Sequence, residues 1–160
     1  MRILDAGCGS GSMTREIAKA ASAAVVVDID LRDKYTDYAR RRAEAEGLRN
    51  LTFETGDVRE LPFPDGAFDI IWTKYLLQWV AEPVRAMREF ARVLKPGGLL
   101  VSANFDGFAV TNEPPDPAIQ PMTKFVFNGL VDPFIGRKMA WMCLDCGFID
   151  IDVKVRPTAF

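Results

Sequence analysis

The stretch LDAGCGSG, residues Leu4–Gly11, decides the fold of this chain. It follows a short apolar run that is typical of a strand, Arg2–Asp5, and it leads into a segment with helical spacing, Ser10–Ala21. Three alternating glycines let the backbone take conformations that other residues avoid, and they leave no side chains in the way of a ligand. The helix that follows offers free N–H groups to an anionic group. The stretch therefore predicts a ligand-binding turn between a strand and a helix.

Strands and helices alternate along the rest of the chain. The predicted strands are Arg2–Asp5, Ala24–Ile29, Leu51–Thr55, Ala67–Thr73, Leu99–Ala103 and Phe148–Val155. The predicted helices are Ser10–Ala21, Tyr35–Glu46, Pro83–Leu94 and Phe134–Cys146. This order favours a mostly parallel sheet with helices on both faces, which is a Rossmann-like, doubly wound α/β fold. We expect a single domain over residues 1–160.

Apolar spacing also predicts which side of each early helix faces the sheet. In the first helix the inner residues are Met13, Ile17 and Ala20, with Ser10 or Ser12 as the cap. The predicted inner residues of the second helix are Tyr35, Ala39 and Ala43. Lys95–Gly98 is expected to end the third helix sharply, before the strand that starts at Leu99.

The overall composition excludes several classes of protein. The chain has 160 residues and a net charge of −2, so we expect no nucleic-acid partner. It has no histidine, which excludes catalytic triads that use this residue. No apolar run is long enough to span a bilayer and no secretory signal opens the chain, which favours the cytoplasm and no membrane partner. Three cysteines form no disulfide framework. Cys143 and Cys146 lack further metal ligands, so no metal site is predicted.

Three further stretches extend the pattern of the glycine turn. They are Asn50–Trp72, with its Gly-Asp pair and Leu-Pro-Phe loop, then Ala91–Val101 and Asp132–Phe148. Together with LDAGCGSG, these motifs resemble class I S-adenosylmethionine-dependent methyltransferases of the ubiquinone/menaquinone-biosynthesis-like branch, over about residues 3–155. The resemblance implies methyl transfer from S-adenosylmethionine to a small-molecule acceptor by in-line displacement.

Two alternative functions stay open. A truncated relative would bind S-adenosylmethionine without transferring its methyl group. A nicotinamide-dependent oxidoreductase is less favoured, because the G-x-G-x-x-G spacing of dinucleotide-binding turns leaves Gly11 unexplained.

The resemblance implies roles for residues around the first two strands. Gly7, Cys8, Gly9 and Gly11 would lie against the methionine part of the cofactor. Asp5 would hold the loop or the methionine ammonium. An acidic residue at the end of the second strand would accept hydrogen bonds from both ribose hydroxyls, because a carboxylate has two acceptor oxygens. Asp28 and Asp30 both qualify, and a gap-free match to the following helix favours Asp30.

Further site residues follow from the same resemblance. Ile29 and Leu31 would pack on the adenine, whose amino group would donate to Asp57 and which would accept from the Val58 backbone N–H. Thr73 and Lys74 follow the fourth strand, where the family offers a backbone carbonyl to the methionine ammonium. The residues expected to orient the acceptor are Gln78, which stands where related sequences often carry histidine, and Tyr75. Glutamine can orient a hydroxyl but cannot take its proton.

The ends of the sequence differ from the family pattern. The chain begins on the first strand and ends at Phe160, so the usual N-terminal helices and a full seventh strand are missing. We expect a minimal or truncated domain with an exposed sheet edge, which a homodimer would cover. The identity of the acceptor and its target atom stays open.

Overall fold

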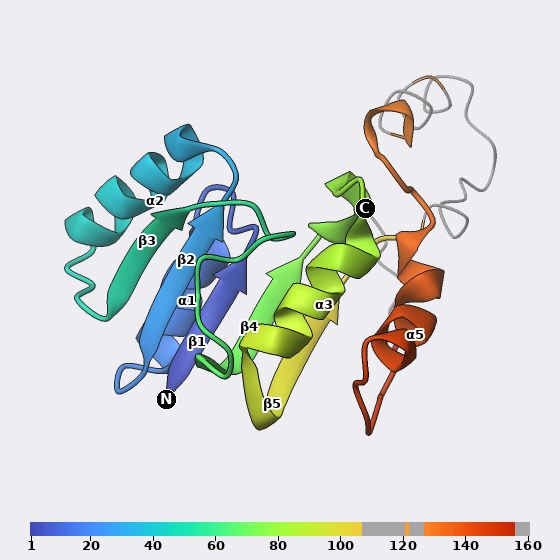
Figure 1. Cartoon of the computed structure of the whole chain (residues 1–160). Helices are drawn as coiled ribbons and strands as arrows, with labels where there is room; N and C mark the ends of the chain where they lie inside the picture. The colour runs from blue at the N-terminus through green and yellow to red at the C-terminus, as the bar shows by residue number, and fades with distance from the viewer. Residues whose placement is uncertain (107–120, 122–126, 156–160) are drawn as a thin grey trace.

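Five parallel strands form one sheet in the part of the chain that the structure describes, residues 1–106, 121 and 127–155. The structure is a computed structural model, and its strand order is β3-β2-β1-β4-β5 (Figure 1). The strands are β1 (Arg2–Ala6), β2 (Val25–Asp30), β3 (Leu51–Thr55), β4 (Phe68–Lys74) and β5 (Leu94–Ala103). All neighbouring pairs are parallel, which confirms the Rossmann-like α/β class expected from the sequence.

Helices cover both faces of this sheet. They are α1 (Ser12–Ala20), α2 (Asp33–Ala45), α3 (Pro83–Val93) and α5 (Ile135–Asp145), with a short 3-10 helix, η1 (Leu77–Trp79). Alternate residues of a strand point to opposite faces, so Ile3 belongs to the cluster that includes Ala18 of α1, whereas Leu4 belongs to the cluster on the α3 side of the sheet. In Figure 1, α3 and α1 lie on opposite faces of the sheet. Within the described residues, no helix is long and apolar enough to cross a membrane.

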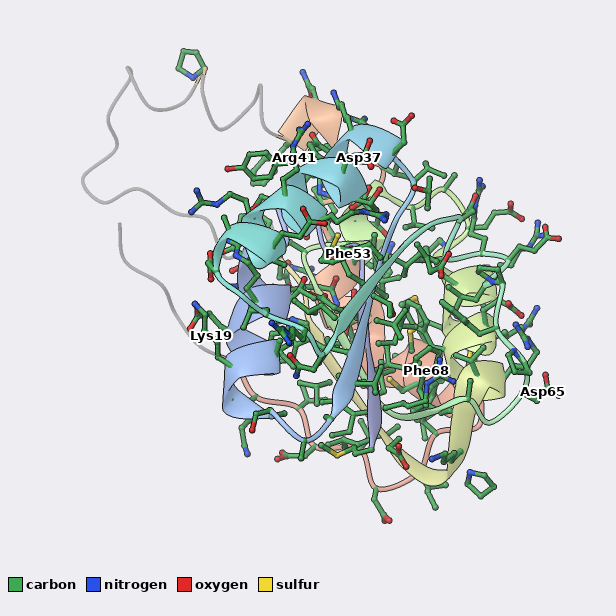
Figure 2. All side chains as sticks on the ribbon, turned by 90° about the vertical axis from the view of Figure 1, so that its left-hand side faces the viewer. Lys19, Asp37, Arg41, Phe53, Asp65 and Phe68 are labelled. Carbon is green, nitrogen blue, oxygen red and sulfur yellow. The ribbon has the colours of Figure 1, made fainter. Side chains whose placement is uncertain are left out.

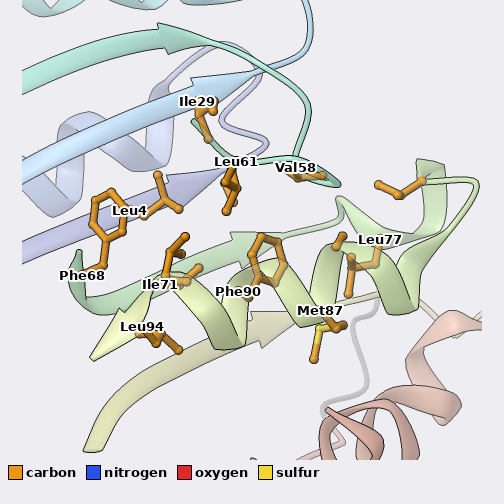
Figure 3. Packing of buried hydrophobic residues seen from close by; sticks show 14 of the residues in the cluster. Leu4, Ile29, Val58, Leu61, Phe68, Ile71, Leu77, Met87, Phe90 and Leu94 are labelled. Atoms are coloured by element: carbon orange, nitrogen blue, oxygen red, sulfur yellow. The ribbon is translucent and has the colours of Figure 1, made fainter. Parts of the chain in front are cut away.

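The larger core lies between the sheet and α3. Phe90 and Met87 of α3 are fully buried, as is Ile71 of β4. Figure 3 shows them together with Leu61, which comes from the loop between β3 and β4. Leu61 thereby anchors this loop to the core. The loop joins β3 to β4 without a helix between them.

The buried face of α1 differs from the predicted one. Thr14 and Ala18 are buried, whereas Met13 is exposed. Polar interactions of Thr14 explain this difference. The Thr14 hydroxyl bonds to two buried carboxyl groups that an apolar side chain would leave unpaired. The helix also has no side-chain cap, since Gly11, in a left-handed conformation, is its N-cap residue.

The buried face of α2 is also shifted from the prediction. Ala39 and Ala43 are buried as expected, but Thr36 takes the place predicted for Tyr35. The Thr36 hydroxyl accounts for this difference, because its Oγ1 lies 3.0 Å from Oγ1 of Thr55 at the end of β3. The polar link turns Thr36 inward and leaves Tyr35 on the exposed side.

The C-terminal part departs further from the sequence prediction. Residues 148–155 form no strand, so the prediction of a strand over Phe148–Val155 is wrong. Asp150 has a φ of 54°, a left-handed conformation that interrupts any extended run. Ile149 and Val155 are 83% and 87% exposed, because no neighbouring strand covers them in the described part of the chain.

Strand β5 begins earlier than predicted. It starts at Leu94, which pairs with Phe68, and the next pair in the register joins Leu99 to Ile70. The Lys95–Gly98 turn is therefore a bulge within the strand rather than a boundary, and Gly97 provides the left-handed conformation (φ 76°) that this bulge needs.

Asn50, just before β3, ties three chain segments together. Its side-chain amide donates to the carbonyl oxygens of Ala18, Ala21 and Ala24 at 3.0, 3.3 and 3.1 Å. These carbonyls belong to the end of α1 and to the turn before β2. The two N–H groups of this amide are shared among the three acceptors, and they link the end of α1 to the turn before β2.

Charged side chains cover the outer surface of α1 and α2. Lys19, Asp37 and Arg41 point away from the sheet in Figure 2. Lys19 and Arg15 of α1 both pair with Glu46 at the end of α2, each at 2.9 Å. These ion pairs are exposed or partly exposed, so each adds little stability.

Arg92 of α3 holds the loop between β3 and β4 in place. Its guanidinium donates to the carbonyl oxygens of Leu61 and Phe63 at 3.1 and 2.8 Å, and to the carboxylate of Glu89 at 2.7 Å. We expect Arg92→Leu to lower the free energy of unfolding by about 1–3 kcal/mol, because these acceptors lose their donor. Urea denaturation measures the change. Arg88→Leu, an exposed change on the same helix, is the control, and equal effects of the two variants would contradict the prediction.

Candidate functional site

The glycine turn leaves the sheet at the point where the strand order reverses. It follows β1, which lies between β2 and β4, and ligands of open α/β sheets bind at this position. Gly7, Gly9 and Gly11 all have left-handed conformations, with φ values of 77°, 56° and 67°. The N–H groups of Gly7 and Cys8 donate to the carbonyl oxygen of Ile29 at 2.9 and 3.3 Å. The turn is therefore anchored to β2 and not free to move by itself.

The three glycines have different surroundings. A Cβ atom added at Gly9 would meet nothing within 4 Å, whereas one at Gly7 would come within 2.6 Å of the Leu76 side chain. A Cβ atom at Gly11 would lie only 2.5 Å from Cβ of Ala39 on α2. Gly9 thus lies on the open side of the turn, and Gly11 is required where α1 and α2 approach each other.

The two acidic residues of β2 also differ in their surroundings. Asp30 is partly exposed at the end of the strand, and its Oδ2 accepts from the Gly9 N–H at 3.0 Å. Asp28 is fully buried and points toward Thr14. Between them, Ile29 is buried in the core, while Leu31 is 65% exposed. The structure therefore brings only Asp30 and Leu31 to the open side of the turn.

Asp5 and Asp28 form a buried carboxyl pair behind the turn. Thr14 Oγ1 lies 2.6 Å from Oδ2 of Asp5 and 3.1 Å from Oδ2 of Asp28. Burial raises the pKa of Asp5 to about 7 and the pKa of Asp28 to about 6, and neighbouring negative charges add to the increase. Burial also raises the pKa of the Cys8 thiol, which stays protonated at neutral pH.

A cavity of about 240 Å³ opens beside this pair and the turn. Its lining residues are Asp5, Gly7, Cys8, Ser12, Met13, Trp72, Lys74 and Tyr75. Trp72 and Lys74 are alternate residues of β4 and so point to the same face. Within the described ranges, the buried Trp72 Nε1–H has no hydrogen-bond partner. Thr73 is fully buried and does not line the cavity.

The two residues predicted to orient the acceptor lie in different places. Tyr75 lines the cavity, and its φ of 55° is a left-handed conformation that is uncommon for a tyrosine. Gln78 is buried in η1, and its Oε1 accepts from the Phe105 N–H at 3.3 Å. Its backbone carbonyl accepts from the N–H of Val131 at 2.9 Å. Gln78 therefore joins η1 to the segments around residues 105 and 131, and it does not line this cavity.

Asp57 lies near the end of β2, because the adjacent Gly56 N–H donates to the Asp30 carbonyl oxygen at 3.0 Å. The Asp57 carboxylate accepts from the backbone N–H of Arg59 at 2.9 Å and from its guanidinium at 2.6 Å. This side-chain bond holds the pKa of Asp57 below its usual range, so the carboxylate stays an acceptor. The Val58 side chain is buried in the core.

Some residues of this region were not predicted from the sequence. The bonds of Thr14 to the buried carboxyl groups and the place of Trp72 in the cavity wall become apparent only in the fold. A signal for Thr14 did exist, because Asp5 within an apolar strand needs a hydrogen-bonding partner. Cys143 and Cys146 pack against the core. Within residues 1–106, 121 and 127–155, no group of three or more His, Cys, Asp or Glu side chains is placed to hold a metal ion.

Comparison with known proteins gives the class of this domain. The family model described as "Methyltransferase domain" matches residues 4–102, and the chain belongs to this family. The resemblance to the menaquinone-biosynthesis-like branch of the S-adenosylmethionine-dependent methyltransferases is thereby confirmed. S-adenosylmethionine is the cofactor of these enzymes.

Individual relatives are longer than this chain. An uncharacterized 37.1 kDa protein in transposon TN4556 of Streptomyces fradiae is 39% identical over 91% of this chain, which covers 42% of it. The demethylmenaquinone methyltransferase of Thermus thermophilus is 36% identical over 84% of this chain, which covers 58% of it. The chain thus spans about half the length of these relatives.

One solved structure combines high identity with a different activity. The crystal structure of the [4+2]-cyclase SpnF is 38% identical to this chain, with a TM-score of 0.61. The match covers 63% of this chain and 37% of the cyclase.

Proposed function

We propose that this domain transfers a methyl group from S-adenosylmethionine to a small-molecule acceptor. The observation that carries the proposal is the bond from the Gly9 N–H to Asp30 Oδ2 on the open side of the turn. This bond places the Asp30 carboxylate, which can accept from both hydroxyls of a ribose, next to the backbone of Gly9. No side chain covers the backbone at Gly9. A nucleoside that carries an amino-acid chain fits this pair of features.

We infer a contact residue for each part of the cofactor around the turn. Asp30 would accept from the ribose hydroxyls, and Asp5, which lines the cavity, would face the methionine ammonium. The backbone of Gly7, Cys8 and Gly9 would lie along the methionine part. Gly11 would contribute indirectly, by allowing α1 to pack closely on α2.

The adenine would lie between the ends of β2 and β3. Asp57 would accept from its amino group and the Val58 backbone N–H would donate to the ring. The exposed Leu31 would pack on the ring, while Ile29 supports the turn from the core. Arg59 keeps the Asp57 carboxylate ionised and in place for this contact.

The acceptor would lie in the cavity, against the wall that β4 forms. The cofactor supplies a methyl group already activated as a sulfonium, so the chain needs to align the acceptor and exclude water rather than supply a strong base. Alignment of this kind contributes up to about 7–11 kcal/mol. Tyr75 and Lys74 line the cavity and would orient the acceptor there, with Thr73 held beneath them. Gln78 would act from further away, by holding η1 in position.

Asp30 gives the direct test of cofactor binding. We expect Asp30→Asn to weaken S-adenosylhomocysteine binding about 10- to 100-fold, because the charged acceptor of two hydroxyl bonds is lost. Isothermal titration calorimetry measures the affinity. Asp33→Asn removes an exposed carboxylate at the start of α2 and serves as the control. Unchanged affinity in Asp30→Asn would contradict the proposed ribose contact.

Binding alone does not establish transfer. One solved structure that is similar to this chain is named as a [4+2]-cyclase, so transfer of the methyl group has to be measured separately from binding. A labelled methyl group from S-adenosylmethionine should appear in a product when the protein is supplied with small-molecule pools. Binding without any transfer would favour the alternative of a binding module. A cytoplasmic location and a homodimer stay predictions, the latter open to size-exclusion measurement.

A further inference from the structure

Thr14 lies between two carboxyl groups that are both buried. Its Oγ1 is within hydrogen-bond distance of Oδ2 of Asp5 and of Oδ2 of Asp28. A hydroxyl carries one hydrogen, so Thr14 can donate to one of these oxygens only. If both carboxyl groups were ionised, one negative oxygen would face the Thr14 oxygen with no hydrogen between them. The geometry therefore requires a second hydrogen in this chain of three side chains.

Burial indicates which carboxyl group carries that hydrogen. Asp28 is fully buried, and its Oδ1 has no hydrogen-bond partner among the described residues. An ionised group in such a place is costly. Asp5 lines the cavity, and its 2.6 Å contact with Thr14 has the length of a hydroxyl bond to a carboxylate. Asp28 thus donates to Thr14, and Thr14 donates to an ionised Asp5.

The neighbouring charges are consistent with this assignment. Negative charge on Asp30, at the end of the same strand, favours a neutral Asp28. The positive charge of Arg40 on α2 has the opposite effect on the pKa of Asp28, and so does the contact between Asp28 and the Cys8 thiol of the turn. Burial has the largest effect on the pKa of Asp28, and it favours the proton.

We propose that Asp28 is a positioning residue that acts as a neutral acid through Thr14 and keeps Asp5 ionised toward the cavity for a cationic ligand group. The proposal rests on the proposed function, in which that group is the methionine ammonium. When the cation binds, one proton stays on Asp28. Any second proton held by the pair leaves Asp5 for the solvent, so charge and protons balance.

The proposal makes the affinity depend on pH. Burial raises the pKa values of this coupled pair, so the second proton enters on the acid side of neutral pH and neutralises Asp5. Affinity for S-adenosylhomocysteine should then fall about tenfold from about pH 7.5 to about pH 5.0. The affinity for 5′-methylthioadenosine, which lacks the amino-acid part, should stay constant over the same range.

Substitutions at Asp28 and Thr14 test the assignment by calorimetry. Asp28→Asn keeps a neutral donor to Thr14, so Asp5 should titrate in the variant as it does in wild type, and the affinity for S-adenosylhomocysteine should stay within about twofold of wild type from about pH 5.0 to about pH 7.5. Thr14→Val should weaken binding at least about tenfold near pH 7.5, and Thr14→Ser should restore it. Circular dichroism verifies that each variant is folded.

Two results would overturn the proposal. One is an Asp28→Asn variant that loses affinity as strongly as Asp30→Asn, because Asp28 would then act as a charged ligand. The other is an Asp28→Asn variant whose affinity no longer depends on pH, because Asp28 and not Asp5 would then be the group that titrates. Failure of the proposed function would be different, because wild type would then bind neither S-adenosylhomocysteine nor 5′-methylthioadenosine.

Discussion

Replacing Gly11 with alanine is expected to destabilise the fold by about 2–5 kcal/mol. Two costs add at this position. The left-handed conformation, with φ 67°, disfavours any residue with a Cβ atom, and that atom would lie 2.5 Å from Cβ of Ala39. The Ala39 backbone is also close, with Cα at 3.3 Å, so α1 and α2 would have to separate. Urea denaturation followed by circular dichroism measures the loss.

Gly47 offers a matched control for this prediction. It has nearly the same φ, 68°, but a Cβ atom there would meet nothing within 4 Å. Gly47→Ala should therefore show the backbone cost alone, about 1 kcal/mol. Equal losses in the two variants would show that the contact with Ala39 has no effect on stability, against the prediction.

Replacing Phe90 with alanine should cost about 3–5 kcal/mol. Phe90 is fully buried in α3 and lies in the larger core with Leu61 and Ile71 (Figure 3). Removing its ring leaves a cavity that rigid neighbours on the sheet cannot fill completely, so the lost contacts add to the lost burial. The midpoint of thermal unfolding and the urea titration both report this loss.

A second phenylalanine provides the comparison for Phe90→Ala. Phe134, which precedes α5, is 40% exposed, and its ring lies under the guanidinium of Arg137. Phe134→Ala should cost clearly less than the buried change, because solvent already reaches much of the ring. A loss as large as that of Phe90→Ala would contradict the assignment of the main core to the space beneath α3.

Much of the fold was predictable because its central strands, β1 and β2, are buried on both sides. β-branched runs such as Ala24–Ile29 leave few alternatives to a central parallel strand. The prediction of a strand over Phe148–Val155 failed because the sequence pattern there is weak. Its apolar residues alternate imperfectly, and a sequence pattern does not show whether an adjacent strand exists to pair with. The left-handed Asp150 then decides against extension.

The candidate site was predictable where backbone conformation determines it. The glycine turn and Asp30 are at the place that the sequence indicated, on adjacent strand ends. Thr14 was missed because apolar spacing was used to orient α1, whereas a buried polar bond sets its rotation. Gln78 was predicted from its position after β4, but the direction of a side chain in a 3-10 helix depends on tertiary contacts such as that with Phe105.

The Asn50 amide has a consequence for local opening motions. It reaches three carbonyl groups, so the tail of α1 cannot fray without also releasing the entry to β2. Separate segments are thereby coupled into one cooperative unit, whose amide hydrogens would exchange with solvent together rather than one element at a time.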